Sequence, residues 1–199
     1  MPKVGYSEKE REGVRERLMD ACLELTVRQG VRRTTVEQLC RAAGISRSFF
    51  YTFFPSKEEL LVEALYRQQP KLADYARALA AELPLGEAAR RFLHECCHGE
   101  RSGIAVLSLE EQQLVFRRLT DEGYAQFREK QRRLFGELLK IFGARADDAR
   151  VGIFTNLCLS VIVTRRAIPD SMPLFVPEAA DATLDVQIDA VADWLESLS

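Results

Sequence analysis

The sequence predicts an all-α protein with a small N-terminal domain and a larger helical body, and three observations support this. Helix-capping patterns recur along the chain, each followed by apolar residues at helical spacing. No segment shows the period-two alternation of a half-buried strand. The 199 residues are 47% hydrophobic and 29% charged, which is enough apolar material for a packed core. We therefore expect about nine helices, with residues 1–56 forming a three-helix domain and residues 57–199 forming the body.

The first two helices are marked by their caps. Ser7 and Glu10 form a capping-box pattern that predicts a helix over residues 8–29, and Gly30 ends it. A second capping-box pattern, at Thr34–Glu37, predicts the start of a short helix.

A turn and two further helices follow. Gly44 can adopt the left-handed backbone that a tight turn needs, and a third short helix is expected to start near Ser46. Pro55 ends that helix, and Ser56 caps a fourth helix that continues to about Leu79. Two short helices separated by a few residues around a glycine predict a helix-turn-helix.

The body is expected to be helical throughout. Amphipathic patterns predict helices over residues 84–98, 109–119 and 122–142. Residues 147–165 are apolar on nearly all sides, which is typical of a helix buried against neighbours or a partner chain. Apolar residues of the segment 184–198 fall on a single helical stripe, which predicts the last helix.

Charge is divided unevenly along the chain. The net charge is −2, from 28 Lys and Arg against 30 Asp and Glu. Residues 1–57 contain 11 of these cations and 7 of the carboxylates, whereas the remainder contains 17 and 23. A basic N-terminal segment on an acidic body indicates that one end of the molecule meets a polyanion.

Several classes of protein are excluded or disfavoured. The longest stretch without a charged residue, Val151–Thr164, has 14 residues, whereas a membrane span needs about 20. The N-terminal residues contain no apolar core of a signal peptide, so we expect a cytoplasmic protein. The five cysteines are odd in number and scattered, which argues against a disulfide framework.

The most informative segment is residues 44–60, which read GISRSFFYTFFPSKEEL. This segment resembles the DNA-binding signature of the TetR family of bacterial repressors, in which a glycine turn leads into a short recognition helix. The upstream segment GVRRTTV at residues 30–36 also fits, and the resemblance covers about residues 12–63. It implies a ligand-responsive repressor that binds a palindromic DNA operator as a homodimer.

The resemblance and the charge pattern together indicate which residues contact DNA. Lys57 and the pair Arg32 and Arg33 stand at predicted helix starts, where a cation opposes the helix dipole unless a phosphate docks beside it. The full predicted set is Arg32, Arg33, Thr34, Thr35, Arg47, Ser48, Phe49, Tyr51, Phe53 and Lys57.

Individual roles within this set differ. The resemblance implies that the Tyr51 hydroxyl holds a phosphate. Arg47 reaches either a guanine edge, through its bidentate fork, or a phosphate without sequence preference. Phe49 departs from the small residue common in the family, so it either presses on a thymine methyl or tilts the helix in the groove. Phe50, Phe54 and Ile45 are expected to be core residues.

The body is expected to bind a small-molecule effector and to form the dimer. Effector binding would favour a dimer whose recognition helices are wrongly spaced for DNA. The residues proposed for the effector pocket are Phe92, Cys96, Phe116, Tyr124, Phe127 and Phe154. Those proposed for the dimer interface are Val151, Phe154, Leu157, Val161, Leu184, Ile188, Val191 and Leu195.

One further motif offers alternatives. Residues 94–98, HECCH, match the H-E-x-x-H pattern of zinc proteases and contain both histidines of the chain. One alternative function is therefore a metal- or thiol-redox-responsive regulator using His94, Cys97 and His98. Another is a zinc metallohydrolase using the same pattern, although no third ligand can be identified. Ordinary helix residues remain the favoured interpretation, and we expect no catalytic residue, metal or cofactor.

Overall fold

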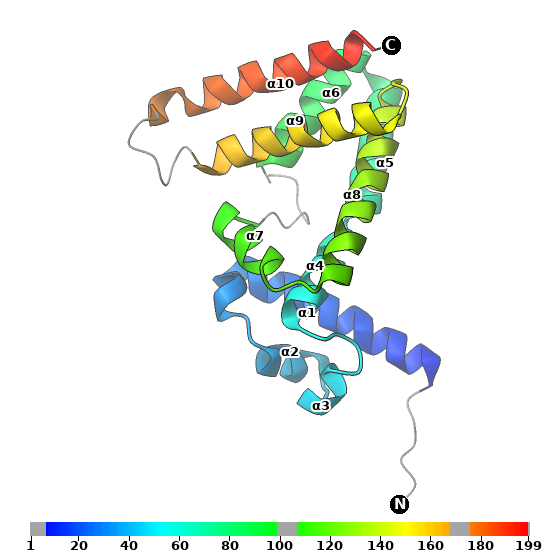
Figure 1. Ribbon diagram of the computed structural model, residues 1–199, viewed down its shortest axis with the longest axis vertical. Coiled ribbons are helices and arrows are strands. Elements are labelled where there is room, and N and C mark those ends of the chain that lie inside the picture. The colour runs from blue at the N-terminus through cyan, green and yellow to red at the C-terminus, as the bar shows by residue number, and fades with distance from the viewer. Residues whose placement is uncertain (1–6, 99–106, 168–175, 199) are drawn as a thin grey trace, which may run out of the picture. The chain divides into compact units, whose positions relative to one another are not determined.

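A computed structural model of the chain describes residues 7–98, 107–167 and 176–198, and within these ranges all regular structure is helical (Figure 1). The elements are α1 (Glu8–Arg33), α2 (Val36–Ala43), α3 (Arg47–Phe50), α4 (Lys57–Tyr66), α5 (Gln69–Glu82), α6 (Leu85–His98), α7 (Leu109–Phe116), α8 (Asp121–Ile141), α9 (Asp148–Ala167), the short 3-10 helix η1 (Pro177–Ala179) and α10 (Ala180–Glu196). The expectation of an all-α chain without a sheet is confirmed for the described residues.

The chain divides into two compact units. The N-terminal unit comprises residues 1–67 and 110–124, and the C-terminal unit comprises residues 68–109 and 125–199. The N-terminal unit thus extends past the expected boundary at residue 56, because α4 packs against α1. It also contains α7, which lies far along the sequence from the helix-turn-helix.

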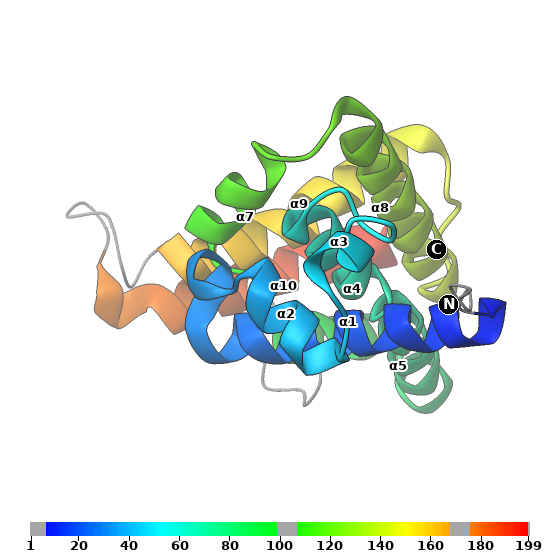
Figure 2. The same cartoon turned by 90° about the horizontal axis from the view of Figure 1, so that it is seen from below.

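The N-terminal unit is built around one long helix. Figure 2 shows α1 passing both α2 and α4, and α1 packs against each of them. Leu18, Leu39, Phe50 and Leu60, from α1 to α4, are completely buried in this unit. Since α3 has only four residues, it is too short to be stable alone, and Phe50 anchors it to the core.

The end of α1 and the start of α2 differ in detail from the sequence prediction. Gly30 has φ +82°, a left-handed conformation that favours glycine, and it kinks α1 so that one further turn reaches Arg33. The cap of α2 is Thr35 rather than Thr34: its hydroxyl accepts the Gln38 amide, and the Gln38 side chain accepts the Thr35 amide. Thr34 instead caps the end of α1.

The fourth predicted helix is two helices. α4 ends at Tyr66 and α5 begins at Gln69, in place of a single helix to Leu79. Pro70 explains the break, because a proline inside a helix lacks the amide donor and clashes with the preceding turn. At the start of α5 the same proline is well tolerated.

The C-terminal unit has its own core. α10 packs against α6 and α9, and α5 packs against α6. Phe154 is fully buried at the centre, where its ring stacks on Trp194 and meets Phe135 edge to face. Salt bridges from Arg90 of α6 to Asp189 and Asp193 of α10 lie at the rim of this packing.

This core corrects the predicted dimer interface. Seven of the eight predicted residues are at most 5% exposed and pack inside their own chain: Val151, Phe154, Val161, Leu184, Ile188, Val191 and Leu195. Only Leu157 is partly exposed. The apolar stripes of α9 and α10 therefore face each other and α6 rather than a partner.

No helix in the described parts of the chain is long and apolar enough to cross a membrane.

The burial of Phe50 predicts its effect on stability. Phe50→Ala should lower the free energy of unfolding by about 3–5 kcal/mol, because it leaves a cavity in the core behind α3. Val27→Ala, at a position of the same unit that is 72% exposed, should change it by less than about 0.5 kcal/mol. Urea denaturation followed by circular dichroism measures both, and equal effects would contradict this packing.

Candidate nucleic-acid interface

The segments before and after α3, the helix expected to meet DNA, fix its position. Gly44 ends α2 with φ +70° and permits the sharp turn into α3. The Ser46 hydroxyl then caps α3 by accepting the Phe49 amide at 3.2 Å. Phe50 is buried in the core, whereas Arg47, Ser48 and Tyr51 are exposed.

Arg47 and Tyr51 are one helical turn apart and interact. Hydrogen bonding to the Tyr51 side chain raises the pKa of the Arg47 guanidinium, a group that is charged at physiological pH in any case. Tyr51 is 47% exposed, so its hydroxyl is accessible to a ligand. The structure thus brings together the two residues predicted to touch a base edge and a phosphate.

Phe49 and Phe53 are less accessible than their neighbours on α3. Both rings are half-buried and meet edge to face at 4.9 Å between centroids. The guanidinium of Arg11, from α1, lies 4.7 Å from the Phe53 centroid and 5.9 Å from that of Phe49. These three side chains connect the recognition helix to the first helix. Arg11 was missed by the sequence analysis, because no local pattern shows which ring a distant cation will cover.

Lys57 connects the start of α4 to the end of α1. Its ammonium donates hydrogen bonds to the carbonyl oxygens of Val31 at 2.7 Å and Thr34 at 2.5 Å. Burial lowers the pKa of Lys57 from its usual value. A cation at the dipole-negative end of α1 is stabilising, which offsets its unfavourable place in the first turn of α4.

The remaining predicted residues lie around the same junction. Arg32 and Arg33 occupy the last turn of α1, where cations are favoured, rather than the start of α2. Arg32 pairs with Glu110 of α7 at 2.9 Å, and both side chains are largely exposed. The Thr34 side chain is buried and its hydroxyl donates to the Gly30 carbonyl at 2.9 Å.

A hollow of about 410 Å³ opens between α2, α3 and α4. It is lined by Thr34, Thr35, Val36, Glu37, Arg47, Tyr51, Pro55, Ser56, Lys57, Glu58 and Arg118. Five of the predicted DNA-binding residues therefore line it, namely Thr34, Thr35, Arg47, Tyr51 and Lys57. A hollow with several cations, a phenol and a threonine hydroxyl is suited to an oxyanion such as a phosphate.

The residues predicted to line the effector pocket do not line one common hollow among those described here. Phe92 and Phe154 are buried in the core of the C-terminal unit, and Cys96 and Phe127 are half-buried in that unit. Phe116 and Tyr124 belong to the N-terminal unit, where their rings meet edge to face.

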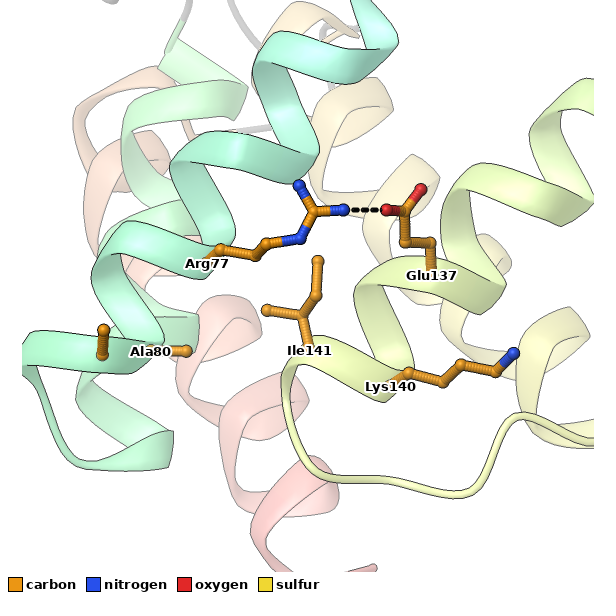
Figure 3. Close-up of a pocket in the computed structure, with 6 residues that line it drawn as sticks. Arg77, Ala80, Glu137, Lys140 and Ile141 are labelled. Atoms are coloured by element: carbon orange, nitrogen blue, oxygen red, sulfur yellow. Dashed lines mark hydrogen bonds and ion pairs between the residues drawn. The ribbon is translucent and has the colours of Figure 1, made fainter.

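A different hollow lies between α5 and α8 (Figure 3). Its volume is about 420 Å³, and it is lined by Arg77, Ala80, Ala81, Glu137, Lys140 and Ile141. The Arg77–Glu137 ion pair closes one side of it, as the dashed line in Figure 3 shows. None of the six predicted effector residues lines it.

The HECCH motif forms the end of α6. The His94 side chain is exposed, with Nε2 4.0 Å from a carboxylate oxygen of Asp185. The side chains of Cys97 and His98 lie outside the described residues. Among the described side chains, no group of three His, Cys, Asp or Glu residues could hold a metal ion. Of the other cysteines, Cys22 is buried, which raises the pKa of its thiol to about 12 and makes it unreactive.

Comparisons with known proteins agree with this geometry. Residues 18–64 match the family model described as bacterial regulatory proteins, tetR family. The HTH-type transcriptional regulator SrpR of Pseudomonas putida is 40% identical over 74 residues, which cover 37% of this chain and only 35% of SrpR. TcmR of Streptomyces glaucescens, also an HTH-type transcriptional regulator, is 29% identical over 207 aligned positions, covering 96% of this chain and 90% of TcmR.

The fold is also found among solved structures. Thermus thermophilus FadR, a TetR-family transcriptional repressor crystallised in complex with lauroyl-CoA, has a TM-score of 0.58 at 19% identity. That likeness covers 92% of this chain and 93% of FadR.

The glycine turn, the short exposed helix and the buried phenylalanines behind it define a helix-turn-helix protein. The match of residues 18–64 to the family model, and the likeness of fold to FadR over 92% of this chain, specify which kind of helix-turn-helix protein it resembles. Residues 18–64 match the N-terminal domain of the tetR family of bacterial regulatory proteins, and the chain as a whole has a fold like that of Thermus thermophilus FadR.

The hydrogen bonds of Lys57 predict a structural effect of its removal. Lys57→Met keeps the aliphatic stem but removes both bonds to the end of α1, so the free energy of unfolding should fall by about 1–3 kcal/mol. Lys9→Met, at an exposed position in the first turn of α1, serves as the control and should have little effect. Chemical denaturation measures both, and a Lys57 variant as stable as the wild type would contradict the connecting role.

Proposed function

We propose that this protein is a ligand-responsive transcriptional regulator that represses its targets by binding palindromic DNA as a homodimer. The observation that carries the proposal is that Arg47, Ser48 and Tyr51 are exposed at α3, and that Arg47 and Tyr51 line the hollow together with Lys57. Recognition helices of helix-turn-helix proteins contact base edges mainly through their N-terminal residues. Arg47 and Ser48 occupy that end of α3.

Each group at the interface has a distinct task in this proposal. Arg47 reads a base edge, or else binds a phosphate, and Ser48 lies beside it. Tyr51, Thr35 and Lys57 bind the phosphate backbone from the hollow. The Lys57 ammonium has three donors and uses two on carbonyl oxygens, so one remains for a phosphate. Phe49 and Phe53 brace α3 against α1 and meet DNA only at their exposed edges.

The homodimer follows from the size of the recognition helix. One helix reads too few base pairs to select a site in a genome, so two copies on a two-fold operator are needed. The outer face of α9 and α10 is the proposed interface, because apolar side chains are exposed there. Ile153, Val163 and Val186 are 48%, 37% and 69% exposed.

The effector is proposed to be a small molecule bound by the C-terminal unit. FadR was crystallised with lauroyl-CoA, which supports ligand binding within this fold but does not identify the ligand of this chain. Effector binding shifts the regulator between two states only by its difference in affinity for them.

DNA binding can be measured directly. We expect the protein to bind duplexes selected from a random pool, with an affinity that falls steeply as salt rises. Tyr51→Phe should weaken binding to selected and random duplexes alike, because it removes the hydroxyl that binds a phosphate. Arg47→Ala should also change the selected sequence if the guanidinium reads a base, at a cost of about 1–3 kcal/mol. Fluorescence anisotropy at several salt concentrations measures the affinity of the wild type, of Tyr51→Phe and of Arg47→Ala for each duplex.

The control for these variants is Arg145→Ala, which removes an exposed arginine from the loop between α8 and α9. It should leave DNA binding unchanged. Failure of the wild-type protein to bind any duplex at low salt would reject the proposed function.

The dimer interface has its own test. Replacing both Ile153 and Val186 with glutamate should convert the dimer to a monomer, because it buries two uncompensated charges per protomer. Light scattering after size-exclusion chromatography measures the mass. Val27→Glu, an equally exposed apolar position on α1, should leave the dimer intact. A double variant that stays dimeric would place the interface elsewhere.

A further inference from the structure

One cation at the hollow does not come from the helix-turn-helix. Arg118 follows α7, well beyond the end of the family match at residue 64. Its side chain is 61% exposed, yet it lines the same hollow as Arg47, Tyr51 and Lys57. Burial lowers the pKa of Lys57, and the charge of Arg118 contributes to the same lowering, so the two cations lie close together.

The segment that carries Arg118 is held on the helix-turn-helix by several polar contacts. The Glu111 carboxylate accepts the Val31 amide at 2.9 Å, next to the kink of α1. At the other end, Thr120 donates from its amide and its hydroxyl to Glu59 of α4, at 3.2 and 3.0 Å. Arg118 lies between these two attachments, so its position relative to α4 is defined by contacts on both sides.

The acidic groups of the hollow already have cationic partners. Glu58 is nearly fully buried and accepts from Nη1 of Arg118 at 3.4 Å. Glu37 pairs with Arg41 along α2 at 3.3 Å. Three cations against two carboxylates leave the lining with a net positive charge. Arg118 has five N–H donors and the bond to Glu58 engages one nitrogen, so donors remain for an oxyanion.

We propose that Arg118 is a phosphate-binding residue of the DNA interface, contributed by the α7 segment from outside the helix-turn-helix. The inference rests on the proposed function, because it assigns Arg118 to the same DNA backbone that Tyr51 and Lys57 contact. A planar guanidinium can hold a phosphate oxygen while it keeps its bond to Glu58. DNA binding then depends on where the α7 segment sits as well as on the helix-turn-helix.

The test compares Arg118→Gln with Arg117→Gln, which removes the neighbouring exposed arginine that does not line the hollow. Arg118→Gln should weaken binding to selected and random duplexes by a similar factor. It should also make the slope of log affinity against log salt shallower by about 0.9 for each phosphate that the protein no longer neutralises, or about 2 for a dimer. Arg117→Gln should match the wild type, and Arg118→Lys should restore part of the affinity and of the slope.

The double variant Glu58→Gln with Arg118→Gln distinguishes phosphate binding by Arg118 from a purely structural role as the partner of Glu58. It removes the buried carboxylate together with its cation, so thermal stability should return while DNA binding stays weak and the salt slope stays shallow. Recovery of both affinity and slope in the double variant would overturn the proposal. So would an unchanged salt slope in Arg118→Gln while the wild type binds DNA. If the wild type bound no duplex at all, the proposed function itself would fail.

Discussion

The geometry of the N-terminal unit depends on the ammonium of Lys57, which bonds to the carbonyl oxygens of Val31 and Thr34 at the end of α1. This one group satisfies carbonyls that the helix cannot pair internally, and it joins the beginning of α4 to the end of α1. α2 and α3 lie in the chain between those two points. Lys57 also lines the hollow, so the group that joins these two helices belongs to the proposed DNA-binding surface as well.

Much of the fold was accessible from local patterns. The caps at Ser7, Ser46 and Ser56 mark helix starts that the structure confirms. Caps are predictable because they satisfy backbone groups within a few residues. The break between α4 and α5 was missed although Pro70 was visible, because proline is tolerated at a helix start as well as being a helix breaker.

The sequence predicted some of the exposed residues of the candidate site but not which distant residues they contact. Arg47 and Tyr51 are exposed while Phe50 is buried, as expected from the sequence for residues of a DNA-binding helix. The partners of Lys57, the stacking of Arg11 on Phe53 and the approach of Arg118 to the hollow all join residues distant in the sequence. No local pattern encodes such pairings. The same limit explains the dimer prediction, since an apolar stripe such as Leu184–Leu195 shows that a face is buried but not by which chain.

Phe49, Phe53 and Arg11 pack together and hold α3 against α1, a role different from that of the exposed residues of α3. Phe50 and these three side chains hold α3 on the core, whereas Arg47 and Ser48 are exposed and hydrogen-bond to near neighbours in the sequence, Tyr51 and Ser46 respectively. Under the proposed function, operator preference and domain stability would be carried by different side chains on a single helical turn. If the proposed function holds, randomising Arg47 and Ser48 together would alter the preferred DNA sequence while the buried Phe50 is kept.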